Sequence, residues 1–242
     1  MYHPDGLTFL ELMRQALAST ERGYDLIAPK FDHTPFRTPD AVLEAVMRAI
    51  ADDTGGGRPV CAALDVCCGT GASMRHLRAR CTERVVGLDM SQGMLDEAGR
   101  RLEDAPGTAA IELVRGDALA LQFKSEFDVA TCVGAFGHIL PKDEDRFVAG
   151  IARALRPGGR FVFATSEMPP VTSASWCMAR SCNAAMRMRN ALLHPQFIMY
   201  YLMFLWPGVR TLLERNGFRV QGRRGLAVAP FDRVIIVVAT KD

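Results

Sequence analysis

The sequence lacks an apolar run long enough to cross a membrane. Its longest, residues 197–206, has ten residues, whereas a transmembrane helix needs about 20. The chain also begins without the basic start of an export signal, and the apolar pattern of residues 7–17 is interrupted by Glu11 and Arg14. We therefore expect a cytoplasmic protein with no transmembrane segment, for which contact with a membrane surface stays open.

Excess charge and a disulfide framework are also missing. The 242 residues carry 29 Lys and Arg against 27 Asp and Glu, a formal net charge of +2. Because nucleic-acid-binding domains normally have a clear basic excess, we expect no nucleic-acid partner. Seven cysteines is an odd number, Cys67 and Cys68 are adjacent, and no C-x-x-C pair occurs. These features predict reduced thiols in the cytosol and no metal site.

The sequence does contain a regular alternation of short apolar strands and amphipathic helices. Such an alternation predicts an α/β fold with a mostly parallel sheet and helices on both faces. The last two strands are close enough in sequence to pair antiparallel. We expect a Rossmann-like, seven-stranded sheet whose last strand is antiparallel. The predicted strands are residues 60–66, 84–88, 111–114, 128–133, 160–165, 218–221 and 233–239, and the predicted helices are 7–19, 38–52, 73–80, 92–102, 143–155 and 209–216.

We expect residues 1–242 to form one domain with four parts. Residues 168–213 differ most from the rest, because they contain no Asp or Glu but four Arg, six Met and both Trp. Flexible thioethers suit an adaptable apolar pocket, so we interpret this stretch as a helical lid. The parts are an N-terminal helical cap (1–37, with its pattern broken at Gly23), a cofactor-binding core (38–167), a helical insertion or lid (168–213) and C-terminal strands (214–242).

A glycine turn joins the first strand of the core to the next helix. Gly69 and Gly71 follow a buried strand, an arrangement that brings backbone N–H groups and a helix N-terminus close to a ligand. The dinucleotide pattern G-x-G-x-x-G would need a third glycine, but Met74 stands there. The turn alone therefore leaves the cofactor open.

Acidic side chains follow three successive strands. Asp65 closes the first, Asp89 the second, and Asp117 follows the third. The carboxyl ends of parallel strands meet at one edge of the sheet, where ligands of open α/β folds bind. A carboxylate in the place of Asp89 can accept both hydroxyls of a ribose. Asp117 is placed to bind an adenine amino group.

In combination, these motifs resemble the Rossmann-fold S-adenosylmethionine-dependent methyltransferases. The resemblance rests on D-x-x-x-G-x-G over 65–71, the acid that closes the second strand, G-D-A over 116–118 and L-R-P-G-G-R over 155–160. The pairs Y-D at 24–25 and F-D at 31–32 are similar to the small-molecule branch that includes the ubiquinone and menaquinone C-methyltransferases.

The resemblance implies S-adenosylmethionine as cofactor, with S-adenosylhomocysteine as product, and a contact for each matching residue. Cys67 stands where the family often has glycine. Tyr24 would lie in the segment that folds over the cofactor. The implied contacts are Asp65, Gly69 and Gly71 with the methionine part, Asp89 with the ribose, Met90, Asp117 and Ala118 with the adenine, and Val133 and Gly134 beside the methionine part.

The resemblance also implies methyl transfer to a small, apolar or aromatic metabolite. His138 lies where the acceptor should meet the methyl group and is the candidate general base, with a structural role as the alternative. Residues 134–138 lack the Asn-Pro-Pro-Tyr motif of amino-group DNA methylation. Three alternatives stay open: a catalytically idle cofactor-binding subunit, a nicotinamide-dependent oxidoreductase, and arsenical methylation at Cys67 and Cys68 with Cys177 and Cys182. The sequence does not fix the oligomeric state.

Overall fold

The computed structural model describes residues 6–52, 59–229 and 231–242. Residues 1–5, on which the expectation of no export signal partly rests, lie outside the described residues. A seven-stranded sheet runs through the centre with the order β3-β2-β1-β4-β5-β7-β6. The strands are β1 (Val60–Val66), β2 (Cys81–Asp89), β3 (Ala110–Arg115), β4 (Phe127–Thr131), β5 (Leu155–Thr165), β6 (Phe218–Arg223) and β7 (Ile235–Lys241).

The pairing of the strands confirms the predicted fold class. The first five strands pair in parallel with one another, and β7 lies antiparallel between β5 and β6. Several predicted boundaries are wrong by a few residues. The largest shift is at β5, for which residue 160 was the predicted start: the strand begins at Leu155 and accommodates residues 157–159 where its register with β4 shifts.

Helices cover both faces of the sheet because its central strands are apolar on both sides. Alternate residues of β1 point to opposite faces: Leu64 and Val66 contact one apolar cluster, and Ala63 contacts the other. The first cluster includes side chains of α6 (Glu144–Ala154) and α8 (Gly208–Arg215), and the second includes those of α3 (Asp40–Asp52), α4 (Ala72–Arg78) and α5 (Gln92–Leu102).

The N-terminal cap consists of α1 (Phe9–Leu17), α2 (Thr20–Ile27) and the 3₁₀ helix η1 (Ala28–His33). The expectation that Gly23 breaks the helical pattern is wrong, because Gly23 lies buried inside α2. A Cβ atom on Gly23 would come within 2.7 Å of Phe197 Cε2. Glycine is present at this position to let α2 and the insertion approach each other.

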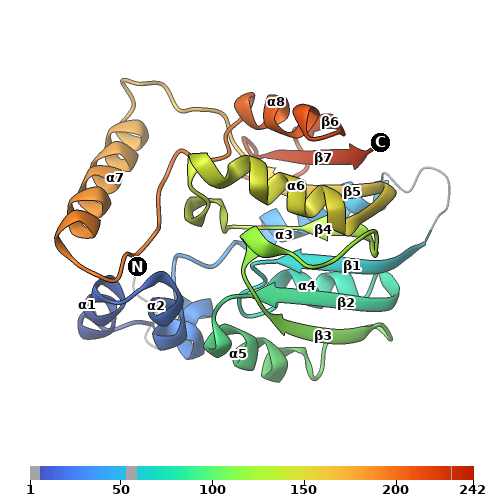
Figure 1. Cartoon of the computed structure of the whole chain (residues 1–242), viewed down its shortest axis with the longest axis horizontal. Coiled ribbons are helices and arrows are strands. Elements are labelled where there is room, and N and C mark those ends of the chain that lie inside the picture. Colours follow the sequence, from blue (N-terminus) through green and yellow to red (C-terminus); the bar gives the residue numbers. More distant parts are fainter. Residues whose placement is uncertain (1–5, 53–58, 230) are drawn as a thin grey trace.

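The insertion after β5 contains one long helix, α7 (Ala174–Leu192), which stands away from the sheet at the same end of the molecule as α1 (Figure 1). The expectation of a largely helical insertion holds for α7 only, since residues 193–205 contain no helix. No helix in the described ranges is both long and apolar enough to cross a bilayer.

Candidate active site

A cavity of about 330 Å³ opens at the carboxyl ends of β1, β2 and β4. Of the predicted site residues, all but Gly71 line it. Its predicted lining residues are Tyr24, Asp65, Cys67, Gly69, Asp89, Met90, Asp117, Ala118, Val133, Gly134 and His138. The sequence reasoning missed further lining residues, including Thr20, Phe31, Phe36, Arg37, Thr70 and Ile198. For the lining residues that come from the cap, the Y-D and F-D pairs were the only signal in the sequence.

The glycine turn after β1 takes backbone conformations that favour glycine. Gly69 and Gly71 have φ angles of 53° and 83°. A Cβ atom on Gly69 would have no atom within 4 Å, whereas one on Gly71 would lie 2.9 Å from Leu102 Cδ1. Gly69 therefore leaves space at the cavity, and Gly71 allows α5 to pack behind the turn. Cys67 also has a positive φ of 57°, a conformation that costs a residue with a Cβ atom about 1–2 kcal/mol.

The turn lacks the third glycine of the dinucleotide pattern, but a glycine on the neighbouring strand allows the same close packing. Met74 is fully buried, and a Cβ atom on Gly87 of β2 would lie 2.3 Å from its sulfur. The small residue that permits close packing of helix and strand therefore stands on the strand. This arrangement explains how the turn keeps its shape without glycine at position 74.

Asp65 is a buried carboxyl group at the end of β1. It is 2% exposed, and Thr131 Oγ1 on β4 donates a hydrogen bond to its Oδ1 at 2.6 Å. Burial raises the pKa of Asp65 to about 7, although the Thr131 hydrogen bond lowers it and the nearby charge of Asp89 raises it. A cationic group in the cavity would stabilise the ionised carboxylate.

Asp89 closes β2 and fixes the glycine turn. The Gly69 N–H donates to its Oδ2 and the Ser91 N–H to its Oδ1, both at 2.9 Å. Burial raises the pKa of Asp89, and these backbone donors counteract the rise. Each carboxylate oxygen has more than one acceptor site, so both can still accept ligand hydroxyls.

The far end of the cavity is more open. Asp117 and Met90 are exposed at its rim. Asp117 Oδ1 accepts a hydrogen bond from the Leu119 N–H at 2.8 Å, which orients its carboxylate. Ala118 is buried beside it. The three residues form an edge with one carboxylate and an apolar surface.

His138 and Tyr24 form a hydrogen-bonded pair on the opposite side. Tyr24 Oη lies 2.8 Å from His138 Nε2, and His138 Nδ1 contacts the Ile198 carbonyl oxygen. A carbonyl oxygen can only accept, so Nδ1 carries the proton and Nε2 accepts from the Tyr24 hydroxyl. Burial lowers the pKa of His138 and raises that of Tyr24. The pair is therefore neutral at pH 7.

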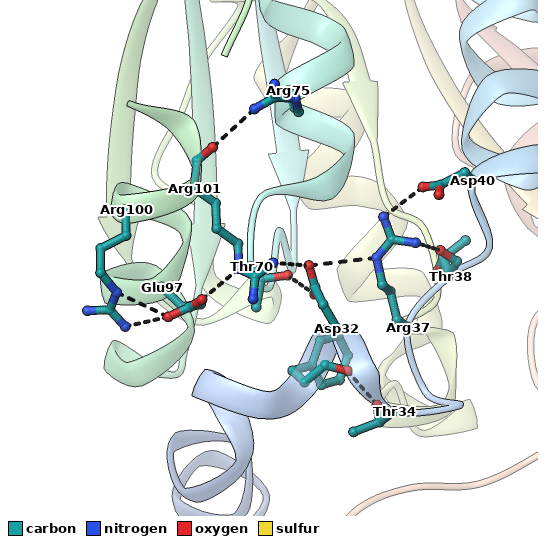
Figure 2. Close-up of polar contacts among 11 residues, drawn as sticks. Asp32, Thr34, Arg37, Thr38, Asp40, Thr70, Arg75, Glu97, Arg100 and Arg101 are labelled. Carbon is teal, nitrogen blue, oxygen red and sulfur yellow. Dashed lines mark hydrogen bonds and ion pairs between the residues drawn. The ribbon is translucent and has the colours of Figure 1, made fainter. Parts of the chain in front are cut away.

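Two acidic residues of the cap attach it to the core, and the sequence reasoning assigned a role to neither. Asp25 Oδ1 accepts from Ser91 Oγ at 2.6 Å and from the Gly93 N–H at 2.9 Å. Asp32 accepts from Thr70 Oγ1 at 2.7 Å and from Arg101 Nη1 at 2.6 Å (Figure 2). Both carboxylates thus hold the cap against the glycine turn and α5.

Asp32 also lies beside Arg37, whose Nε is 3.7 Å from Asp32 Oδ2. Arg37 in turn pairs with Asp40 at the start of α3, with Nη2 and Oδ1 2.7 Å apart (Figure 2). Arg37 lines the cavity. This chain of charged groups connects η1, the segment after it and α3 around one side of the site.

The four cysteines considered for arsenical methylation do not come together at one site. Burial raises the pKa of Cys68, and a thiol contact with Cys132 together with burial raises that of Cys67. Both thiols are therefore protonated at pH 7. Cys177 and Cys182 are exposed on α7 and do not line the cavity. Among the described residues, no group of three or more His, Cys, Asp or Glu is placed to hold a metal ion.

The lid expected over the cavity contributes little to its lining. Of residues 168–213, only Ile198 lines the cavity, so the expectation that this stretch forms much of the pocket is wrong for the cavity as it stands. Phe204 belongs instead to the apolar cluster under the sheet. Phe197 does not line the cavity but stacks on Tyr24, with ring centroids 6.3 Å apart.

The sheet order, the glycine turn and the acids at the strand ends resemble those of Rossmann-fold S-adenosylmethionine-dependent methyltransferase domains. Residues 63–159 match the family described as "Methyltransferase domain". Solved structures agree on the fold. Magnesium protoporphyrin IX methyltransferase from Synechocystis PCC 6803, with bound SAH, superposes with a TM-score of 0.59 at 16% identity, over 97% of this chain and 94% of that one. An O-methyltransferase family protein from Burkholderia thailandensis gives a TM-score of 0.66 at 16% identity, over 98% and 64%.

Curated relatives are similar over somewhat more than half of this chain. A demethylmenaquinone methyltransferase of Desulfitobacterium hafniense (strain Y51) is 34% identical over 140 residues, which cover 55% of this chain and 54% of that protein. A 2-phytyl-1,4-naphtoquinone methyltransferase of Synechococcus elongatus is 30% identical over 150 residues, covering 60% and 63%. The chain thus spans about half the length of the first of these relatives.

Proposed function

We propose that this protein transfers a methyl group from S-adenosylmethionine to a small, apolar, quinone-type molecule in its reduced form. The observation that carries the proposal is the convergence of eleven predicted site residues on one cavity at the carboxyl ends of the strands. Two of the curated relatives are named for quinones. The acceptor class comes from these names and from the apolar residues Ile139 and Ile198, which line the cavity together with His138.

The residues present fit this cofactor. Asp65 offers a buried carboxylate for its ammonium group, and Asp89 has acceptor sites left for ribose hydroxyls. Gly69 leaves open the space that a Cβ atom would occupy. Met90, Asp117 and Ala118 would hold the adenine. When bound, S-adenosylmethionine supplies an electrophilic methyl group on a sulfonium sulfur.

The protein's own residues would align the acceptor and exclude water, and alignment can supply most of the rate of a displacement. The acceptor loses one proton for the methyl group it gains. Tyr24 and His138 are placed to receive it, because His138 Nε2 is neutral and accepts from the Tyr24 hydroxyl. An acceptor hydroxyl that donates to Tyr24 Oη would pass its proton along the same hydrogen bonds.

The decisive experiment combines calorimetry with a methyl-transfer assay. S-adenosylhomocysteine should bind and NAD should not. A reduced 1,4-naphthoquinone with a free ring position should then acquire a labelled methyl group from S-adenosylmethionine. Binding of NAD alone would favour the oxidoreductase alternative. Cofactor binding without transfer to any reduced quinone would favour the idle subunit.

We also place the reaction in the cytoplasm. All seven cysteines lie in the described part of the chain, and all are free thiols, as is typical of a reducing compartment. The partner that we propose for the protein is the small-molecule acceptor.

A further inference from the structure

Helix α7 buries polar side chains and exposes large apolar ones. Asn183 and Asn190 are buried and bind the backbone of the segment that follows: their side-chain amides donate to the Tyr201 and Phe197 carbonyl oxygens. The opposite face of the helix is apolar. Its Met178, Met188 and Leu192 are 68%, 63% and 75% exposed. With residues 100° apart around a helix, these three side chains lie within an arc of about 80°.

Helix α1 shows the same inversion. Gln15 is buried, while four large apolar side chains are exposed; those of Phe9 and Leu10 are 79% and 59% accessible. Together with Met13 and Leu17, they lie within an arc of about 100°. A helix of a globular domain normally turns such a face toward the core. The exposed face is therefore available to a binding partner, because none of the described residues covers it.

Arg189 joins the two helices. Its guanidinium group donates to the Ala16 and Ala18 carbonyl oxygens at the end of α1, at 2.9 and 2.8 Å. Both helices stand at one end of the molecule (Figure 1). We refer to their exposed apolar side chains as the outer apolar surface. It consists of Phe9, Leu10, Met13, Leu17, Met178, Met188 and Leu192.

The exposed apolar face of α1 is flanked by a basic side chain, and the insertion carries no acid. Arg14 is exposed on α1, about 40° beyond Leu10 around the helix, and residues 168–213 contain no Asp or Glu. The acid of α1, Glu11, is paired with Lys30 at 2.8 Å. Apolar side chains with flanking Arg are typical of helices that lie in the interface of an anionic bilayer. Two copies of the chain in symmetric contact would instead bring Arg against Arg.

We propose that the outer apolar surface docks the protein on the surface of a membrane that contains anionic lipids. The site agrees with this placement. Ile198, in the segment held by α7, donates its N–H to Thr20 Oγ1 of α2 at 2.7 Å, and both residues line the cavity. The segments that directly follow α1 and α7 in the chain thus meet at the cavity, so a docked protein would hold the lipid on the side of the molecule from which these segments reach the site.

Co-sedimentation of the full chain with vesicles tests this proposal independently of any methyl transfer. Vesicles of phosphatidylcholine with 30% phosphatidylglycerol should bind the protein at least about tenfold more tightly than phosphatidylcholine alone, and added salt should weaken the binding. The double variant Met188→Gln/Leu192→Gln, and separately Phe9→Ser/Met13→Ser, should reduce binding about tenfold or more. Arg14→Gln should weaken binding to the anionic vesicles only.

The matched control is Val228→Gln, which changes an apolar side chain that is 59% exposed outside this surface and should leave vesicle binding unchanged. Unaltered affinity for S-adenosylhomocysteine and unaltered circular dichroism show that each variant is folded. Equal binding by the variants and the wild type would overturn the proposal. So would a dimer in analytical ultracentrifugation that Met188→Gln/Leu192→Gln dissociates, because the surface would then be an interface between copies of the chain.

Discussion

Gly23 and Phe197 are packed so closely that even a methyl group on Gly23 would lie 2.7 Å from the Phe197 ring. Phe197 in turn stacks on Tyr24, with an interplanar angle of 19°. Because Tyr24 lines the cavity, the contact fixes the distance between the cap and the insertion next to the site.

The first prediction concerns this contact. Gly→Ala inside a helix normally stabilises by about 0.5–1 kcal/mol. Gly23→Ala should instead destabilise by about 1–3 kcal/mol, because the added methyl group overpacks the contact with Phe197. Urea unfolding measures the difference. Gly208→Ala, where a Cβ atom would meet open space, is the control and should not destabilise. A Gly23→Ala protein as stable as the wild type would show that the cap can shift freely.

The second prediction concerns Asp89. Asp89→Ala removes the acceptor for the ribose hydroxyls and for the Gly69 N–H. Since a hydrogen bond to a charged group contributes about 1.5–3 kcal/mol, affinity for S-adenosylhomocysteine should fall about tenfold or more in calorimetry. Asp96→Ala, which removes an exposed carboxylate from α5, should leave the affinity unchanged. Unchanged affinity in a folded Asp89→Ala protein would make Asp89 only a support of the turn.

The third prediction is a pH dependence of stability due to Asp65. Its pKa is raised from an ordinary 3.8 to about 7 in the folded protein. Between about pH 4 and 7 the unfolded chain has released the proton that the folded protein retains, so stability falls as pH rises to 7. Asp65→Asn keeps an oxygen for the Thr131 hydroxyl and carries no charge. Its Tm should exceed that of the wild type above pH 7 and match it near pH 4.

The same group should control cofactor affinity in the opposite direction. Only ionised Asp65 attracts an ammonium group, so wild-type affinity for S-adenosylhomocysteine should weaken as pH falls through about 7. Asp65→Asn should bind weakly and with little pH dependence over this range. Parallel pH profiles for the two proteins would assign the dependence to another group.

The fourth prediction tests the attachment of the cap. Asp32→Ala leaves Thr70 and Arg101 without their common acceptor. Hydrogen exchange should become faster in η1, and affinity for S-adenosylhomocysteine should fall several-fold, because the cap residues that line the cavity are held less firmly. Asp40→Ala breaks the other ion pair of Arg37 at an exposed carboxylate and should have a much smaller effect. Equal effects of the two variants would contradict a specific role of Asp32.

The fifth prediction concerns Tyr24 and His138. His138→Asn and Tyr24→Phe should lower kcat by about 10²–10⁴-fold if the pair receives the proton, with little change in affinity for S-adenosylhomocysteine. Because burial lowers the pKa of His138, wild-type kcat should decline only at pH values below the ordinary range of histidine. An unchanged kcat for both variants would assign His138 the structural role.

Much of the core could be predicted from the sequence because its signals are local. The apolar run of β1, the glycine turn and the acids at the strand ends each lie within a few residues, and the parallel sheet brings them together. The cap could not be predicted in this way. Gly23 breaks a helical pattern when only its neighbours are considered, and only Phe197, far along the chain, shows why it is glycine.

The insertion misled the sequence reasoning for a related reason. Its abundance of Met and aromatic residues indicated an internal pocket, but composition does not tell which way a helix faces. Asn183 and Asn190 turn α7 by binding the backbone of the following segment. The apolar side chains on its other face therefore point outward.

The contact between Met74 and Gly87 makes these two positions epistatic. A Cβ atom at position 87 would lie 2.3 Å from the Met74 sulfur and 2.9 Å from Cys68 Sγ, so Gly87→Ala should be harmful alone and less harmful, though not neutral, together with Met74→Ala. A relative could carry glycine on the helix and a larger residue on the strand with the same packing. The glycine requirement of this turn thus belongs to a pair of positions, and a motif written along the sequence of one element records only half of it.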